Sequence, residues 1–183
     1  MAGKFKKLMG ALITLAFICS SSFAQVPAIL TVEIAKTPAE KTWGLSGRVS
    51  LPENHGMLFI YNPPEKMHFW MFNTLIDLSI AFIDDQQIIR EIHPLKAHPE
   101  KMDPTRPVKT IADIDRYDYW SPEKKFFREH SVTSKANTLW ALEVNAGWFD
   151  RHQIQIGDVV LLNHLNSQLS FIRKGGSTAS KKP

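Results

Sequence analysis

"HFWMFNTLIDLSIAFID", residues 68–84, is the densest apolar run after the first 24 residues of this chain. From residue 76 onward its side chains alternate in type, which is the period of a strand whose two faces differ. One face carries Ile76, Leu78, Ile80 and Phe82, and the other carries Asp77, Ser79 and Ala81. We expect the first set to build a core and the second set to face solvent or a shallow groove.

Two polar residues, Asn73 and Thr74, stand just before this alternation begins. Their side chains readily bond local backbone groups, so they predict a bend in the chain. A second interpretation stays open. In it Trp70, Asn73, Thr74 and Asp77 line a pocket, where the amide and the carboxylate hold a polar ligand.

The rest of the chain predicts further short strands. They cover residues 29–35, 56–61, 88–92, 138–144, 154–162 and 169–172, and residues 68–83 form two strands or one bent strand. Asn62-Pro63-Pro64 predicts a turn, because neither proline can extend a central strand. Residues 84–87, Asp-Asp-Gln-Gln, predict a hairpin turn.

Helices are expected to be few and brief. "TPAEKTWGL", residues 37–45, has Thr37 as N-cap, Pro38 at the first helical position, Glu40 to complete a capping box and Gly44 to end the helix. "SPEKKFFREH", residues 121–130, repeats the pattern with Ser121 as the cap and Pro122 first.

Residues 94–137 differ in character, with five prolines, many charges and little alternation. A stretch of this kind is either a lid or binding loop, or a tolerated surface insertion. With the short strands, the whole pattern predicts a mainly β fold: a compact sandwich or barrel, jelly-roll-like, with two or three short helices. We expect one domain over residues 25–172 and a flexible tail over residues 173–183.

Residues 1–24 have the features of a secretory signal peptide. Lys4, Lys6 and Lys7 precede an apolar stretch, and Ser22-Phe23-Ala24 offers a cleavage site. Cleavage after Ala24 removes the only cysteine, Cys19, and with it any disulfide or cysteine nucleophile. We expect an exported protein in the bacterial periplasm or outside the cell, with no membrane span in its mature part.

Charge and motifs disfavour several classes of function. Residues 25–172 contain 15 Lys and Arg against 18 Asp and Glu, a net charge of −3, so nucleic acid is not an expected partner. The chain has no GxSxG elbow, P-loop or GxGxxG motif, and no cofactor is expected.

Two candidate sites carry different chemistries, and one of them has a structural alternative. Asp77 and Glu143 could be the two carboxylates of a glycan hydrolase. Glu143 could instead be a buried structural carboxylate paired with Arg48 or with backbone groups. Met67, His68 and Met71 are ligand types that hold Cu(I), although alternation points His68 away from the two methionines.

Tryptophans are numerous, and their faces suit sugars and peptides. Of the five, Trp140 is expected in the core, and Trp148, in a turn after Asn145-Ala146-Gly147, is expected to be the most exposed.

Three stretches together resemble a known family: "KTWGLSGRVSLPENHGMLFIY", "FWMFNTLIDLSIAFID" and "LEVNAGWFDRHQIQIGD". They are similar to the bacterial and archaeal domain of unknown function number 192, over about Thr37–Ile92 and Thr138–Leu162. The resemblance implies a compact mainly β domain, frequently exported, with no settled activity. This chain has Phe72, Asp77 and Ser79 where that pattern commonly has lysine, proline and aspartate.

The leading hypothesis is a non-catalytic binding module for an envelope component, either a glycan or a peptide. Its groove would contain Trp70, Asn73, Thr74, Asp77 and Trp148, with Arg48 nearby. The alternatives are a two-carboxylate glycan hydrolase, a periplasmic copper-binding protein and a structural partner of another envelope protein. Whether the protein is an enzyme stays open.

Overall fold

A computed structural model describes residues 28–174, so the predicted signal peptide and residues 175–183 of the predicted tail lie outside the described part. The strands are β1 (Ile29–Ala35), β2 (His55–Glu65), β3 (His68–Phe69), β4 (Leu78–Ile83), β5 (Ile89–Leu95), β6 (Val132–Thr133), β7 (Thr138–Asn145), β8 (Val159–Asn163) and β9 (Gln168–Ile172). The helices are α1 (Pro38–Trp43), α2 (Ile111–Asp115), α3 (Pro122–Glu129), α4 (Trp148–Arg151) and the short 3₁₀ helix η1 (Pro99–Lys101).

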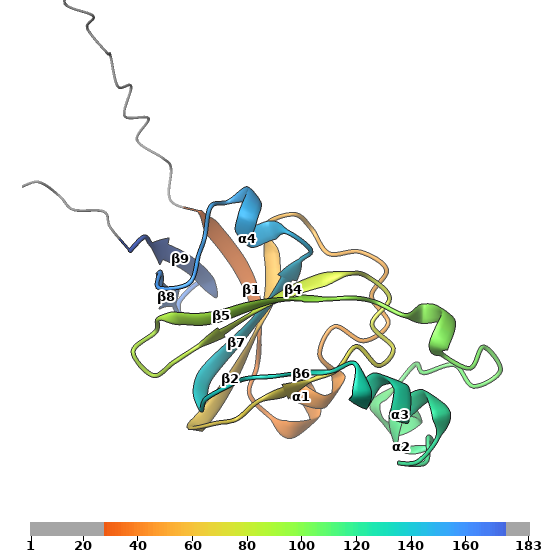
Figure 1. Ribbon diagram of the computed structural model, residues 1–183. Helices are drawn as coiled ribbons and strands as arrows, with labels where there is room; N and C mark the ends of the chain where they lie inside the picture. Colours follow the sequence, from red (N-terminus) through yellow and green to blue (C-terminus); the bar gives the residue numbers. More distant parts are fainter. Residues whose placement is uncertain (1–27, 175–183) are drawn as a thin grey trace, which may run out of the picture.

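Seven of these strands form one curled sheet, a half-barrel, in the order β5-β4-β7-β2-β1-β9-β8 (Figure 1). β1 and β2 pair in parallel, and the other pairs in this sheet are antiparallel. β3 and β6 make a separate two-stranded sheet. The prediction of a mainly β fold is confirmed, and the architecture is the barrel-like one.

The helix predicted at residue 37 is α1, and it makes the crossover between β1 and β2. Thr37 Oγ1 accepts a hydrogen bond from the Glu40 N–H at 3.2 Å, while Glu40 Oε2 accepts one from the Thr37 N–H at 2.8 Å. This reciprocal pair satisfies backbone donors that the first helical turn leaves free. Gly44 ends the helix at a φ of 51°.

The prediction of a turn at Pro63 and Pro64 was wrong, because β2 runs through both prolines to Glu65. Its register with β7 is interrupted between Ile60 and Glu65. The prolines fall inside this interruption, where the ladder needs no N–H donor, and the strand resumes beyond it.

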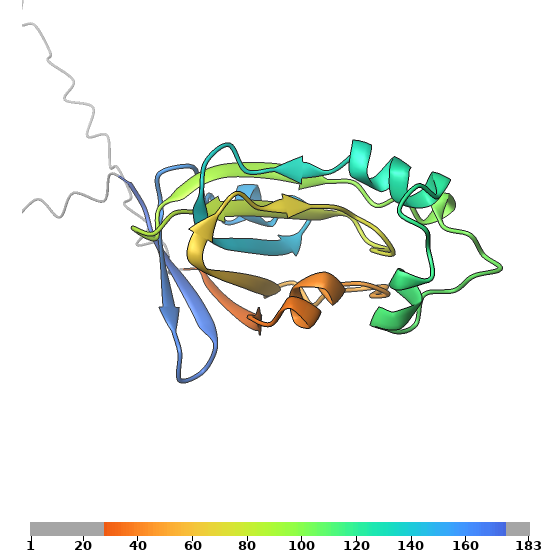
Figure 2. The ribbon, with the colours of Figure 1, turned by 90° about the horizontal axis from the view of Figure 1, so that it is seen from below.

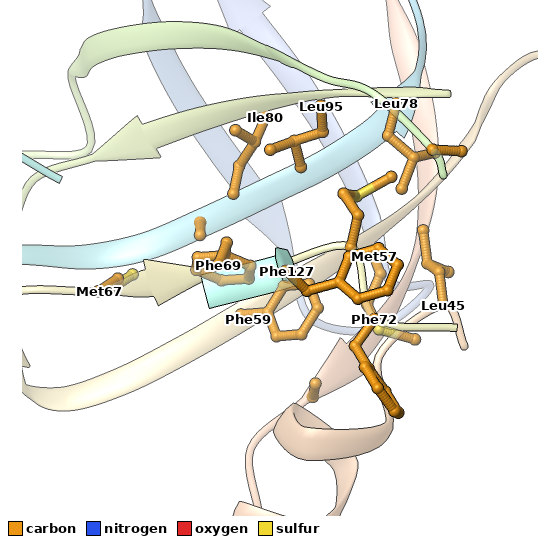
Figure 3. Close-up of a cluster of buried hydrophobic side chains, with 14 of the residues drawn as sticks. Leu45, Met57, Phe59, Met67, Phe69, Phe72, Leu78, Ile80, Leu95 and Phe127 are labelled. Carbon is orange, nitrogen blue, oxygen red and sulfur yellow. The ribbon is translucent and has the colours of Figure 1, made fainter. Parts of the chain in front are cut away.

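Hydrophobic side chains cover both faces of the sheet. The first core takes Met57 and Phe59 from β2, Leu78, Ile80 and Phe82 from β4, and Phe69, Phe72 and Phe127 from outside the sheet (Figure 3). The second core, on the opposite face, takes Leu58, Leu142 and Val144 from the sheet, Trp148 and Phe149 from α4, and Phe171 from β9.

Ser79 and Ala81 were expected to face solvent or a groove, and this was wrong. Both are buried, since α4 covers their face of β4 and the Gly147 N–H donates a hydrogen bond to Ser79 Oγ at 3.0 Å. The alternation of residue types along a strand shows which side chains share a face. It does not show whether another element covers the less apolar face.

Residues 94–137 fold as η1, α2 and α3 at one end of the molecule, followed by β6, which runs back and pairs with β3 (Figure 2). As predicted, Ser121 caps α3: its Oγ accepts a hydrogen bond from the Lys124 N–H at 3.3 Å. Phe127 is 1% exposed and packs in the first core, edge-on to Phe72 with ring centroids 5.5 Å apart. The segment is therefore attached to the body by its own apolar side chains.

The first two residues of the predicted tail bond to the body. Arg173 donates hydrogen bonds to Gln153 Oε1 and to the His152 carbonyl, at 3.1 and 3.0 Å. The Lys174 N–H donates one to Asp158 Oδ1 at 2.9 Å. Arg173 and Lys174 are thus hydrogen-bonded to the body of the domain, beyond the predicted boundary at residue 172.

Gly56 in β2 is required by the close approach of β7. A Cβ at this position would lie 2.6 Å from the Glu143 carbonyl oxygen, which belongs to the backbone and cannot rotate away. We expect Gly56→Ala to lower the free energy of unfolding by about 1–3 kcal/mol through overpacking. Urea denaturation measures this, with Ser50→Ala in an exposed loop as control, and an unchanged midpoint for Gly56→Ala would contradict it.

Candidate functional site: an aromatic cavity with a buried carboxyl group

A cavity of about 400 Å³ lies beside the first core, between α1, β2, β7 and the segments that follow β2 and η1. Its aromatic lining consists of Trp43, Phe59, Tyr61, Phe69, Trp70, Phe72 and Tyr119. Its polar lining includes Lys41, His68, Thr74, Arg128 and Glu143. This size and this mixture of aromatic walls with a few polar groups are typical of small-molecule sites.

Glu143 is the most unusual side chain in the cavity. It lies on β7 in register with Met57 of β2 and Ile80 of β4, and it is 5% exposed. Within residues 28–174 no side chain or backbone group forms a hydrogen bond or ion pair with its carboxyl group. Burial raises the pKa of Glu143 to about 8, so the group is protonated and neutral at pH 7.

The predicted pairing of Glu143 with Arg48 was wrong. Arg48 Nη1 and Nη2 instead donate to the two carboxylate oxygens of Glu33, at 2.6 and 2.5 Å. Glu33 lies on β1, close to the loop after α1 that carries Arg48, whereas Glu143 lies on β7 inside the sheet. The two parallel hydrogen bonds to Glu33 thus satisfy both terminal nitrogens of the Arg48 guanidinium group.

Two cations line the cavity without a carboxylate partner among the described residues. Lys41 Nζ lies 3.6 Å from the centroid of the Tyr61 ring. The Arg128 guanidinium lies 3.9 Å from the centroid of the Tyr119 ring and also donates to the Tyr119 carbonyl. Aromatic faces therefore hold both cations in place and leave their charge unneutralised.

Asn73 forms the predicted bend. Its φ is 55°, and its Nδ2 donates to Ser46 Oγ at 2.7 Å and to the Val108 carbonyl at 3.2 Å. The side chain thus links the loop after α1 to residues 94–137, and it does not line the cavity. Thr74 is buried and does line it, as does the half-buried Trp70, which stacks on Phe72 with ring centroids 5.3 Å apart.

Asp77 lies outside the cavity. Its carboxylate accepts from Lys96 Nζ at 2.6 Å and from the Ala97 N–H at 2.9 Å, and these hydrogen bonds hold its pKa below the usual range. Its side chain is 39% exposed, whereas that of Glu143 is buried. The structure therefore does not bring the two candidate carboxylates together in one cavity.

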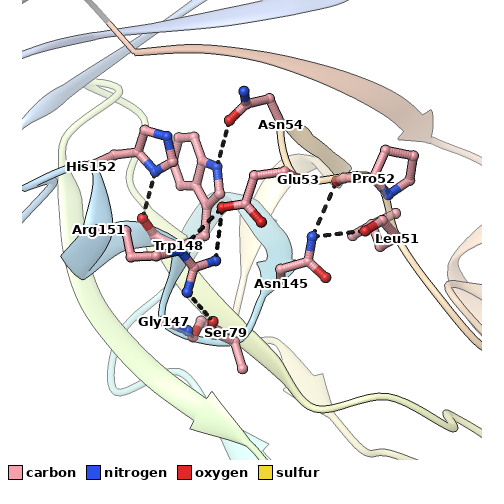
Figure 4. Close-up of polar contacts among 11 residues, drawn as sticks. Leu51, Pro52, Glu53, Asn54, Ser79, Asn145, Gly147, Trp148, Arg151 and His152 are labelled. Carbon is pink, nitrogen blue, oxygen red and sulfur yellow. Dashed lines mark hydrogen bonds and ion pairs between the residues drawn. The ribbon is translucent and has the colours of Figure 1, made fainter.

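Trp148 was expected to be exposed and is fully buried. Its indole Nε1 donates to Asn54 Oδ1 at 3.1 Å and its ring stacks on His152, with centroids 4.2 Å apart (Figure 4). α4 turns back over the sheet after Gly147, whose φ of 71° makes that reversal. Trp148 thus belongs to the second core, on the other face of the sheet from the cavity.

The three residues predicted as copper ligands, Met67, His68 and Met71, do not point to one place, because side chains alternate in direction along β3 and its flanks. Met67 and Met71 are buried in the first core, while His68 is exposed and bonds through Nδ1 to Thr133 Oγ1 at 3.0 Å. Over residues 28–174, no group of three or more His, Cys, Asp or Glu side chains is arranged to hold a metal ion. Nor is any helix of this part long and apolar enough to cross a membrane.

Sequence reasoning missed most of the cavity. Trp43 and Tyr61 carried a signal only as aromatic residues, and Lys41 was read as part of a helix. Tyr119 and Arg128 belong to the segment predicted as a lid or insertion, and they do supply part of the cavity wall.

The fold defines a small β domain with an aromatic cavity, and comparison places the chain in a family. The chain belongs to DUF192, whose description is "Uncharacterized ACR"; the family model matches residues 21–162. No curated protein matches the chain.

Two solved structures are similar to this chain. One, a "putative transcription regulator" from Sinorhizobium meliloti, is 27% identical, with a TM-score of 0.53 over 71% of this chain and 79% of that one. The other, a protein of unknown function from Novosphingobium aromaticivorans, is 29% identical, with a TM-score of 0.52 over 73% of this chain and 82% of that one.

Burial of Glu143 predicts a pH-dependent stability. The unfolded chain releases the Glu143 proton near pH 4.5, while the folded protein keeps it to about pH 8, so this group lowers the free energy of unfolding as pH rises through that interval. We expect Glu143→Gln to match the parent at pH 4 and to exceed it at pH 8 by on the order of 4 kcal/mol.

Urea denaturation from pH 4 to pH 9 measures the difference between the two proteins. Asp77→Asn is the control, because the lowered pKa of Asp77 places its effect at acid pH instead. Parallel profiles for the parent and Glu143→Gln would contradict a buried protonated Glu143.

The two roles of Asn73 can be separated by two substitutions. Asn73→Gly removes the amide but accepts a positive φ, whereas Asn73→Ala removes the amide and adds backbone strain. We expect both to lower the free energy of unfolding, with Ala about 1 kcal/mol worse than Gly. Urea denaturation at pH 7 measures this, and equal midpoints for the two variants would refute the strain.

Proposed function

We propose that this protein is an exported, non-catalytic binding module that takes a sugar unit of an envelope glycan into the aromatic cavity. The observation that carries the proposal is Glu143, a buried neutral carboxyl group without a protein partner, which lines a cavity walled by aromatic rings. A buried polar group of this kind costs free energy unless something bonds to it, and a bound ligand can do so.

The chemistry of the cavity suits a sugar ring. A protonated carboxyl group offers one O–H donor and a carbonyl acceptor, which match a ligand hydroxyl group. The apolar C–H face of a sugar packs on an aromatic ring, and Trp70 and Trp43 offer such rings at the cavity wall.

Binding is favoured over hydrolysis by the number of carboxyl groups. Most glycoside hydrolases use two of them, about 5–9.5 Å apart. Among the described residues, Glu143 is the one carboxyl group that lines the cavity, and Asp77 is engaged elsewhere by Lys96.

The predicted signal peptide supports an envelope location, where glycans are available as partners. The description of the Sinorhizobium meliloti protein as a transcription regulator concerns that protein. In this chain, residues 25–172 have a net charge of −3. They therefore lack the excess of basic residues that DNA-binding domains carry.

Isothermal titration of the mature chain with a panel of envelope oligosaccharides tests the proposal. We expect Glu143→Leu, which keeps the volume but removes the hydrogen bonds, to weaken binding of the recognised sugar by about tenfold or more. Glu143→Gln, which keeps a neutral donor and acceptor, should stay close to the parent.

Asp77→Asn is the matched control, since this carboxylate lies outside the cavity, and it should bind as the parent does. Thermal unfolding checks that every variant is folded. The proposal fails if no glycan binds, or if Glu143→Leu binds as tightly as the parent.

A further inference from the structure

The charges of the cavity are not balanced. Lys41 comes from α1 and Arg128 from α3, and Figure 2 shows these helices apart from each other. Among the described residues neither cation has an ion pair, and the one acidic residue that lines the cavity, Glu143, is neutral at pH 7. The cavity thus holds two positive charges and no negative one.

Elsewhere in the described part, arginines are usually matched by carboxylates. Arg48 pairs with Glu33, Arg90 with Asp84, and Arg151 with Glu53. Arg128 instead packs on the Tyr119 ring, and Lys41 packs on the Tyr61 ring. An aromatic face orients a cation without cancelling its charge, so these two groups remain able to attract an anion.

The position of Arg128 is fixed by the core. Its helix neighbour Phe127 is buried against Phe72, and Phe72 in turn stacks on Trp70 in the cavity wall. Arg128 is itself half-buried and bonds to the Tyr119 carbonyl. A guanidinium group held in this way loses little side-chain entropy when a ligand binds.

We propose that the cavity recognises an acidic sugar, one that carries a carboxylate, with its ring on the aromatic wall and its carboxylate bound by Lys41 and Arg128. This inference rests on the proposed function and specifies its ligand class. It also assigns a role to residues 94–137, which supply Arg128 and thereby part of the specificity of the cavity.

The test compares matched ligands on the full mature chain. Titration with glucuronate oligomers, the corresponding neutral glucose oligomers and glucose 6-phosphate should show that the parent binds the carboxylate sugar about tenfold more tightly than the neutral one. This preference should shrink at high salt, because the added ions screen the partly exposed cations.

The variants separate charge from packing. Lys41→Met keeps the apolar stem over Tyr61, and Arg128→Gln keeps a polar side chain on α3. Each should reduce the preference for the carboxylate sugar over the neutral sugar to about threefold or less. Arg128→Lys should restore part of it, and Lys125→Met, an exposed lysine of the same helix outside the cavity, should leave it intact.

The outcomes distinguish the two proposals. Equal binding of neutral and acidic sugars, weakened by Glu143→Leu, would overturn the acidic-sugar assignment and leave the glycan-binding function standing. Tighter binding of the phosphate sugar than of the carboxylate sugar would also overturn it. No binding of any sugar would overturn both.

Discussion

The double pairing of β7, with β2 on one side and β4 on the other, is the constraint on which the rest of this structure depends. A central strand gives up contact with water on both edges, and here both faces are covered as well. Five of its eight residues are apolar, and Leu142 and Val144 are fully buried beside Glu143. A carboxyl group at that position can avoid the cost of burial only by keeping its proton or by finding a partner.

The surroundings of Glu143 follow from how the two faces are covered. The second core is closed by α4 and the β8–β9 hairpin, whose side chains fill it. The first core is covered by α1 and by residues 94–137, and between these the aromatic cavity remains. The same elements that bury the carboxyl group of Glu143 therefore also shape the cavity in front of it.

Phe72 connects the core to this site. Its aromatic ring is 4% exposed and packs on Phe127 and Tyr117 from the 94–137 segment. The segment is thus anchored through its own aromatic residues, and it supplies a cation, Arg128, to the cavity.

Local patterns in the sequence were sufficient for the elements themselves. Capping residues located α1 and α3, alternation located β1 and β4, a run of strand-forming residues located β7, and the polar pair Asn73-Thr74 marked a bend, because these features depend on neighbouring residues only. The site depended on the tertiary structure. Trp148 is buried, Arg48 pairs with Glu33, and Lys41, Arg128 and Glu143 line one cavity, because each position is decided by which elements pack together in the folded chain. No local pattern encodes such contacts, since they arise only when the sheet curls and its two faces are covered.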